Sequence, residues 1–355
     1  MKYGRSLSDL ALELERQTET KRDMIVPSTL MAHETAADGG SSVVIEQPRQ
    51  GHAIYRTTDN FRRQLADKLK IPFSYFERMR SDQPDLLDRN VNTWLREEPE
   101  ARMVRTLDGA ARAYLSDRYR RLDNYDLLAH VLPILKEIPG ARFESVELTE
   151  KRMYLKVITP QIYTEVKVGD VVQAGVLISN SEVGHGAVSV QPLVFRLVCS
   201  NGLVVPDGRM RKNHVGRIQA TEEDAVTVFA DDTLEADDKA FFLKVRDVTR
   251  AAVSTATLEA AAVKLRKALG IDLTGDPAKA VEAMGVRYLL NEQERSGVLR
   301  AFFVEGEMNA FGLVNAVTRF AQEVDCYDRS TELEALGGKL MELSAHDWKG
   351  IVTAA

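Results

Sequence analysis

The sequence predicts an α+β fold with a central antiparallel β-sheet, flanking helices and a helical C-terminal part. Three observations predict it. Between residues 171 and 205, runs rich in β-branched residues alternate with polar turns, which is typical of antiparallel strands. Apolar residues recur at helical spacing over 58–95 and again from 237 to 344. The 355 residues, 44% of them hydrophobic, are enough to bury a sizeable core.

In the first third of the chain, residues 1–23 contain a possible amphipathic helix with Ser6 or Ser8 as its cap. Residues 25–50 have loop-like composition, with a short strand at 43–45. We therefore expect residues 1 to about 50 to form an arm on a neighbouring subunit or a loose tail. Helices follow over 58–95, where a compact helical pair is favoured over a helix-turn-helix. Residues 102–115 indicate a hairpin that turns at 107–110.

The middle of the chain carries the main sheet signals. A helix is predicted over 125–138, capped by Asp123 or Asn124, and strands over 143–148 and 152–159. Three further strands, 171–178, 187–198 and 203–205, are separated by turns at 179–186 and 199–202. Asn201-Gly202 is the strongest short-range hairpin signal among them.

Helical patterns dominate after residue 217, at 237–269, 276–284, 307–325 and 329–344. The predicted organisation is an N-terminal arm over 1–50, an α+β core over 51–218 and a helical part over 219–355.

Composition limits the functional classes. The formal net charge of −6 argues against a generally basic nucleic-acid binder, although an acidic protein can carry a local basic groove. Two cysteines exclude a disulfide framework and favour a reducing cytoplasm. The first residues lead into a charged segment rather than a signal core, and no apolar run approaches about 18 residues, so we expect no signal peptide and no membrane helix.

Catalytic and metal motifs are weak. The six histidines show no paired ligand spacing and there is no CxxC, so we expect no metal and no cofactor. Cys199 would be reactive if it met His185 or His214, but a small buried side chain before a turn is the favoured interpretation. The Gly184-His185-Gly186 turn lacks the Walker lysine, and a tight hairpin is favoured over phosphate contact. No catalytic residue is predicted.

Basic residues interleaved with tyrosines are the most informative pattern. Arg152, Tyr154 and Lys156 alternate along one strand, which would place them together on an outer face. Lysine and arginine neutralise phosphates, and tyrosine rings stack on unpaired bases. A solvated face balanced by Asp117, Asp123 and Glu165 is the equal alternative. The candidate nucleic-acid-binding residues are Arg118, Tyr119, Arg120, Arg121, Arg152, Tyr154, Lys156, Arg196, Arg209, Arg211, Lys212 and Arg217.

Several motifs match one known family. They are Leu115-Ser116-Asp117-Arg118-Tyr119-Arg120, Asn180-Ser181-Glu182-Val183-Gly184 and Arg196-Leu197-Val198-Cys199-Ser200-Asn201-Gly202, with further stretches at 69–76, 90–95, 315–319 and 334–338. Over roughly residues 50–345 the chain resembles the phage/plasmid-like protein family, a domain of unknown function numbered 932. The resemblance implies mobile-element DNA metabolism in the cytoplasm of a bacterial host, and it implies no catalytic residues.

The expected function follows by fold-level analogy with phage single-strand annealing proteins. It is a phage- or plasmid-encoded homo-oligomer that binds single-stranded DNA and promotes strand annealing in recombination. One alternative is a protein-interaction module that counters a host factor, as in anti-restriction, with an acidic surface over 222–238. Another is an enzyme that uses Cys199, His185 or His214.

Overall fold

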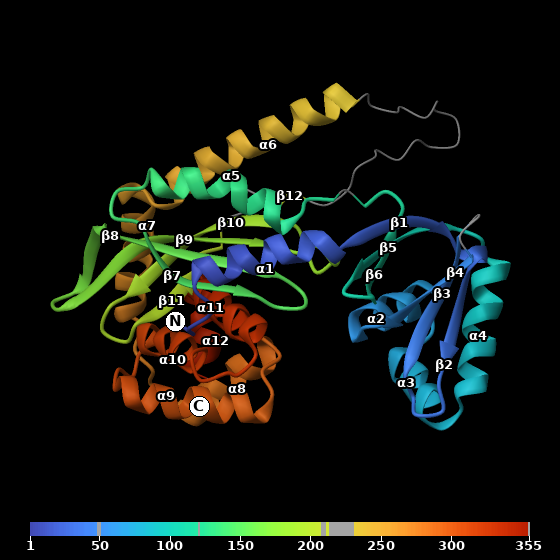
Figure 1. Cartoon of the computed structure of the whole chain (residues 1–355). Coiled ribbons are helices and arrows are strands. Elements are labelled where there is room, and N and C mark those ends of the chain that lie inside the picture. Colours follow the sequence, from blue (N-terminus) through green and yellow to red (C-terminus); the bar gives the residue numbers. More distant parts are fainter. Residues whose placement is uncertain (48–50, 120, 207–210, 213–230, 354–355) are drawn as a thin grey trace, which may run out of the picture.

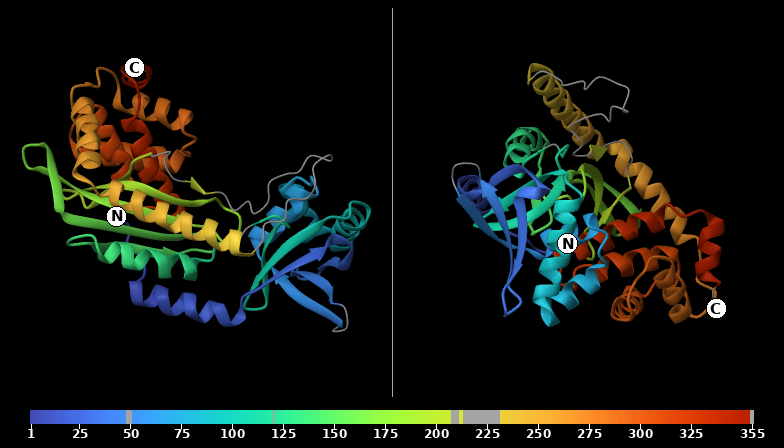
Figure 2. Two further views of the ribbon diagram at one scale, coloured as in Figure 1. Left: turned by 90° about the horizontal axis from the view of Figure 1, so that it is seen from above. Right: turned by 90° about the vertical axis from the view of Figure 1, so that its right-hand side faces the viewer.

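The computed structural model in Figure 1 describes residues 1–47, 51–119, 121–206, 211–212 and 231–353. The chain forms two lobes that lie side by side in Figure 1 and in the left view of Figure 2. The smaller lobe comprises residues 22–116, and the larger lobe comprises the described residues on either side of that segment. Helix α1 (Leu7–Thr20) packs on the larger lobe and leads directly into the first strand of the smaller one.

The described part of the smaller lobe is a six-stranded sheet covered by three helices. The strand order is β1-β5-β6-β4-β3-β2, antiparallel throughout except for β4 beside β6. The strands are β1 (Arg22–Pro27), β2 (Met31–Thr35), β3 (Ser41–Gln47), β4 (Gly51–Thr57), β5 (Ala101–Leu107) and β6 (Ala110–Ser116). The helices are α2 (Asp59–Lys68), α3 (Phe73–Asp82) and α4 (Pro84–Glu97), and a 3₁₀ turn spans Ser28–Leu30. Phe61, Phe76, Leu87 and Val104 meet in the core between these layers.

The larger lobe is built on a second sheet, in the order β11-β10-β9-β8-β7, with β12 also paired to β10. All of its neighbouring strands are antiparallel. The strands are β7 (Arg142–Leu148), β8 (Met153–Lys167), β9 (Asp170–Asn180), β10 (Val188–Arg196), β11 (Asn201–Val204) and β12 (Arg211–Lys212).

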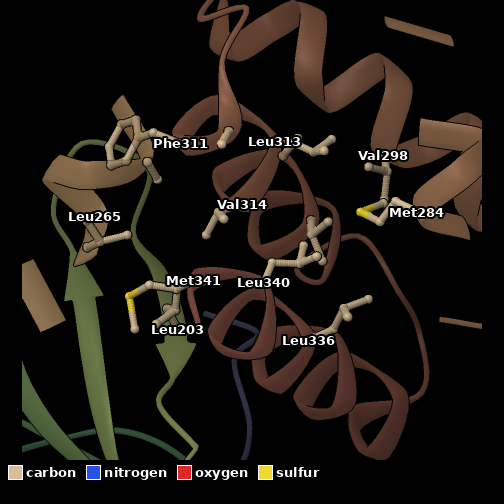
Figure 3. Close-up of a cluster of buried hydrophobic side chains, with 14 of the residues drawn as sticks. Leu203, Leu265, Met284, Val298, Phe311, Leu313, Val314, Leu336, Leu340 and Met341 are labelled. Atoms are coloured by element: carbon tan, nitrogen blue, oxygen red, sulfur yellow. The ribbon is translucent and has the colours of Figure 1, made fainter. Parts of the chain in front are cut away.

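Helices cover both faces of this second sheet. One face packs on α1, α5 (Asn124–Lys136) and α6 (Asp231–Ala252), where Leu10, Val131 and Val245 meet strand residues such as Val176. The other face packs on the C-terminal helices, as Figure 3 shows for Leu203 and the helical residues around it. These helices are α7 (Thr255–Leu269), α8 (Pro277–Arg287), α9 (Glu292–Glu305), α10 (Ala310–Phe320), α11 (Tyr327–Met341) and α12 (Ala345–Val352). Both faces are therefore buried over the central part of the sheet, while the distal part of β8, with Tyr163, is exposed.

The predicted α+β class is confirmed, with a second sheet added. The three helices over 58–95 and the hairpin at 102–115 are confirmed, and the hairpin turns through Asp108 and Gly109 at φ 49° and 73°. Helix α9 escaped prediction because Phe303 and Val304 are exposed while Phe302 is buried, so its apolar residues do not mark one face.

Two expectations are corrected. Residues 1 to about 50 are not a loose tail, because α1 buries Leu10 and Leu14 and because β1, β2 and β3 belong to the first sheet. The boundary predicted at residue 50 therefore falls inside that sheet. Asn201 and Gly202 lie in β11, and the turn is made by residues 197–200, with Ser200 at φ 50°. Within the described residues, no helix is long and apolar enough to cross a membrane.

Candidate functional site

The predicted outer face of β8 lies inside the larger lobe. Lys156 is fully buried, with its Nζ 2.6 Å from Glu334 Oε2 and 4.7 Å from the centre of the Tyr327 ring. The buried Tyr154 hydroxyl donates to Asp328 at 2.7 Å. The expectation of an exposed basic and aromatic face is therefore wrong for Tyr154 and Lys156. The side chains alternate between the two faces of β8 as predicted, but α11 covers the face that was predicted to be exposed to solvent.

Arg196 is also internal. Its guanidinium lies 2.7 Å from Asp170 and 2.8 Å from Glu305. Burial alone would lower the pKa of Arg196, but these two carboxylates raise it, so the charge is fixed inside an ion-pair cluster. The side chain ties β10 to α9 and is not available to an external ligand.

Cys199 adjoins the same cluster, and its thiol donates to Glu305 at 3.2 Å. Burial, followed by this hydrogen bond, raises the pKa of the thiol, which disfavours the nucleophilic thiolate. His185 precedes β10 and Cys199 follows it, so the length of that strand separates them. His214 lies outside the described residues.

The loop over residues 181–187 forms the junction between the two lobes, and Glu182 is its centre. The buried carboxylate accepts from Lys21 Nζ at 2.9 Å, Arg112 Nη2 at 2.6 Å and the Asn124 backbone N–H at 2.7 Å. Burial by itself raises the pKa of Glu182, but Arg112, Lys21 and Arg105 outweigh it and hold the pKa at about 2. A permanent buried charge therefore fastens the smaller lobe to the larger one.

Tyr119 belongs to this junction as well. Its hydroxyl donates to the Ser181 carbonyl at 2.9 Å, and burial raises its pKa. The ring is therefore anchored rather than free to stack on a base. Sequence reasoning missed Arg105, which is fully buried and bonded to Asp23 and to the Glu182 carbonyl. An arginine that directly follows the apolar Met103 and Val104 within a predicted strand, β5, is the signal that could have found it.

The remaining predicted residues fall into three groups. Arg118 and Arg121 are exposed, and Arg152 is half-buried and donates to the His185 carbonyl. Arg211 and Lys212 form β12 at the sheet edge, and their side chains lie outside the described part of the chain. Arg120, Arg209 and Arg217 lie outside the described residues. The structure therefore leaves Arg118 and Arg121 as the predicted cations seen on an open surface.

Arg121 lines a groove of about 540 Å³ between α5 and α6, here called the α5–α6 groove. Its lining residues are Arg121, Leu122, Asp126, His130, Ile134, Lys239, Phe242, Leu243 and Arg246. Helix α6 forms one side of this groove, and no pattern in the sequence predicted that it would lie opposite Arg121. Leu122, Ile134, Phe242 and Leu243 supply apolar surface, and the cations come from both sides.

The rings of His130 and Phe242 stack across the α5–α6 groove, with centroids 3.8 Å apart and planes 5° from parallel. His130 Nδ1 lies 2.8 Å from the Asp126 carbonyl, which can only accept, so Nδ1 carries the proton. In the neutral ring, Nε2 is therefore an acceptor. Burial, followed by the neighbouring Asp123, raises the pKa of Asp126 above its ordinary value.

The charge of the α5–α6 groove favours an anionic ligand. Among the lining residues, three are cations (Arg121, Lys239 and Arg246) and one is a carboxylate, Asp126. Two carboxylates outside the lining partly balance them, because Arg121 lies 3.6 Å from Asp23 and Arg246 lies 2.9 Å from Asp247. Flat aromatic surface beside cations is the arrangement that holds unpaired bases and their phosphates.

A hydrogen-bonded Ser–His–Asp chain in the smaller lobe was also missed by the sequence. Ser41 Oγ lies 2.6 Å from His33 Nε2, and His33 Nδ1 lies 2.7 Å from Asp88. His33 is fully buried and packs edge-on against Phe76, so its ring cannot act on an external substrate. We assign it to holding β2 and β3 against α4. Among the described residues, no group of three His, Cys, Asp or Glu side chains is placed to hold a metal.

Comparison with protein-family models matches residues 112–335, more than half of the chain, to a family described as Domain of unknown function (DUF932). The matched segment contains the whole second sheet, the junction loop and the α5–α6 groove. No curated protein and no solved structure matches the chain.

Proposed function

This chain belongs to the DUF932 family, a domain of unknown function, and on that premise we propose that it binds single-stranded DNA in the α5–α6 groove. We further propose that it is a homo-oligomer that promotes strand annealing in phage or plasmid recombination in the bacterial cytoplasm. The groove, and not the strand face of β8, is the proposed binding surface.

One observation carries the proposal: the α5–α6 groove combines three cations with an apolar and aromatic floor. Phosphates would lie against Arg121, Lys239 and Arg246, and bases would pack on Phe242, Leu243 and the apolar stems of the arginines. His130 Nε2 offers an acceptor to a base amino group. The overall charge of −6 would confine binding to this surface.

The number of cations sets the expected salt dependence. Each phosphate contact on a single strand contributes a slope of about −0.7 to log affinity against log salt. The three cations of the α5–α6 groove therefore predict a slope of about −2 for each bound protomer.

The test is fluorescence anisotropy with a labelled single-stranded oligonucleotide and the matching duplex, across a salt series. The variant Arg121→Ala/Arg246→Ala should lower single-strand affinity by at least about tenfold and bring the slope close to −0.7. The matched control is Arg287→Ala/Arg300→Ala, which removes two exposed, ion-paired arginines from α8 and α9 on the far side of the larger lobe. The control should keep its affinity within about twofold.

Three results would overturn the proposal. They are no single-strand binding at low salt, equal loss of affinity in the groove variant and the control, or tighter binding to the duplex. Annealing is then tested separately, by energy transfer between labelled complementary strands with and without the protein. If the protein binds single strands but does not accelerate their annealing, the proposed DNA site is retained and the proposed annealing activity is rejected.

A second candidate function is capture of an amphipathic helix from a host protein, as an interaction module would do. The exposed Leu243 and Tyr125, at and beside the α5–α6 groove, favour it. This second function predicts that the protein does not bind DNA at low salt. It also predicts that the Leu243→Glu variant no longer captures the host protein that the wild type captures. The acidic surface expected over 222–238 lies largely outside the described residues.

A further inference from the structure

A second cavity lies at the junction of the lobes, where Glu182 and Val183 form part of its lining. This junction cavity measures about 200 Å³. It is lined by Gln17, Thr58, Asn60, Leu107, Asp108, Ala110, Arg112, Asn124, Leu148, Thr149, Glu150, Lys151, Arg152, Glu182 and Val183. The cavity has room for several water molecules but is smaller than typical pockets for drug-sized ligands, so its occupant must be small.

Cations reach the junction cavity from both lobes. Arg112 extends from β6, and Lys151 and Arg152 come from the β7–β8 turn. Lys151 is exposed and has no ion-pair partner among the described residues, and the hydrogen bond of Arg152 goes to a neutral carbonyl, that of His185. The Nε atom of Arg112 is buried and makes no hydrogen bond within the described structure.

The carboxylates of the cavity wall are mostly neutralised from outside it. Asp108 is bonded to Arg16 at 2.9 Å, and Glu182 to Lys21 at 2.9 Å. These two external cations are shared, because Arg16 also pairs with Glu13 at 2.8 Å and Lys21 lies 3.6 Å from Asp123. Arg112 pairs with Glu182, whereas Lys151 and Arg152 form no ion pair among the described residues. Two such cations at a partly enclosed site favour an anion.

The pKa of His185 responds to the positive charge of Lys151 and Arg152. Asn60 Nδ2 donates to the carbonyls of Arg112 and Val183, at 2.8 and 3.2 Å, so Asn60 Oδ1 must be the atom 2.6 Å from His185 Nε2. His185 Nε2 therefore carries the proton. Burial, followed by Lys151 and Arg152, lowers the pKa of His185, while Asp328 opposes the shift.

We propose that the junction cavity binds a phosphate group, held by Arg112, Lys151 and Arg152. Two guanidinium groups and one ammonium suit an anion with several equivalent oxygens better than a single carboxylate. The phosphate has two sources, free inorganic phosphate and the terminal phosphate of an oligonucleotide. The site is separate from the α5–α6 groove and stands whether or not DNA binds there.

The experiment follows the imidazole signals of the full chain, labelled with ¹³C-histidine, by NMR during titration with sodium phosphate at constant ionic strength. The His185 signal is identified by its loss in His185→Gln. In the wild type, phosphate should shift this signal saturably and raise the pKa of His185, because a bound anion offsets the field of Lys151 and Arg152.

The test variant is Lys151→Gln/Arg152→Gln, which changes one exposed and one half-buried side chain. It should weaken the phosphate response by about tenfold or more. The control is Lys264→Gln/Arg266→Gln, two partly exposed cations on α7, and its response should equal that of the wild type. Arg112→Lys, which retains a charge for Glu182, should weaken binding without unfolding the chain.

A linear, non-saturating shift, or an equal response in the test variant and the control, would overturn the proposal. The source is decided by comparing a 5′-phosphorylated trinucleotide with its 5′-hydroxyl counterpart. Tighter binding of the phosphorylated form than of inorganic phosphate assigns the site to a strand end. Equal binding of the two phosphates assigns it to the free ion.

Discussion

Replacing Glu182 with glutamine should loosen the junction between the lobes and destabilise the protein at neutral pH. The substitution preserves shape but removes the charge that accepts from Lys21 and Arg112. It also places an amide N–H where those donors need an acceptor. Lys21, Arg105 and Arg112 are then left in the junction with fewer carboxylates to balance them.

The magnitude follows from the pKa of Glu182. That pKa is held at about 2 against an ordinary value of 4.5, and each unit corresponds to about 1.4 kcal/mol, so the charged form stabilises the fold by about 3 kcal/mol. The loss of one partner from a buried ion pair costs about 3–5 kcal/mol, which agrees in size. Because the folded pKa lies below the unfolded one, this stabilisation is complete above pH 4.5 and is lost as the pH falls towards about 2.

Urea unfolding followed by tryptophan fluorescence measures the effect, because Trp94 lies in α4 of the smaller lobe and Trp348 in α12 of the larger one. Glu182→Gln should lower the unfolding free energy by about 3 kcal/mol at pH 7, and the difference from wild type should shrink below pH 4.5. The control Glu150→Gln, at an exposed position, should change it by less than about 0.5 kcal/mol. A loss below about 1 kcal/mol at pH 7, or a loss independent of pH, would refute the reasoning.

Three further predictions concern other buried features. Lys156→Met should lower the free energy of unfolding in urea by about 3–5 kcal/mol, because it leaves the Glu334 carboxylate buried without a partner. The double variant Lys156→Met/Glu334→Leu should recover most of that stability, and an equally unstable double variant would contradict this. Iodoacetamide should label the exposed Cys326 well before Cys199, whose pKa is raised, and mass spectrometry showing the reverse order would contradict the burial argument. Gly338→Ala should destabilise by about 1–3 kcal/mol or more, because its Cβ would collide with a carbonyl of β11, and an unchanged melting temperature would oppose that contact.

Local signals found most of the secondary structure. The Asp108-Gly109 turn needs two residues at positive φ, and this requirement is visible in the sequence itself. The helical repeat of Phe61 and Leu65 likewise records which side of α2 is buried. Asn201-Gly202 shows the limit of such signals: the pair is compatible with a tight turn, yet cross-strand pairing with β10 places it inside β11.

Local patterns were enough to predict the fold class, the helices around 58–95 and the hairpin at 102–115, because these depend on neighbours within a few residues. The exposure of the cations, in contrast, depends on how distant segments pack together. Period-two alternation separates the two faces of β8, but it cannot say that α11, more than 170 residues later, covers the face that carries Tyr154 and Lys156. It also cannot pair Arg121 with Lys239 and Arg246 across a groove. The burial and the charge balance of a site depend on residues that are distant in sequence, so the candidate sites could be identified only from the folded structure.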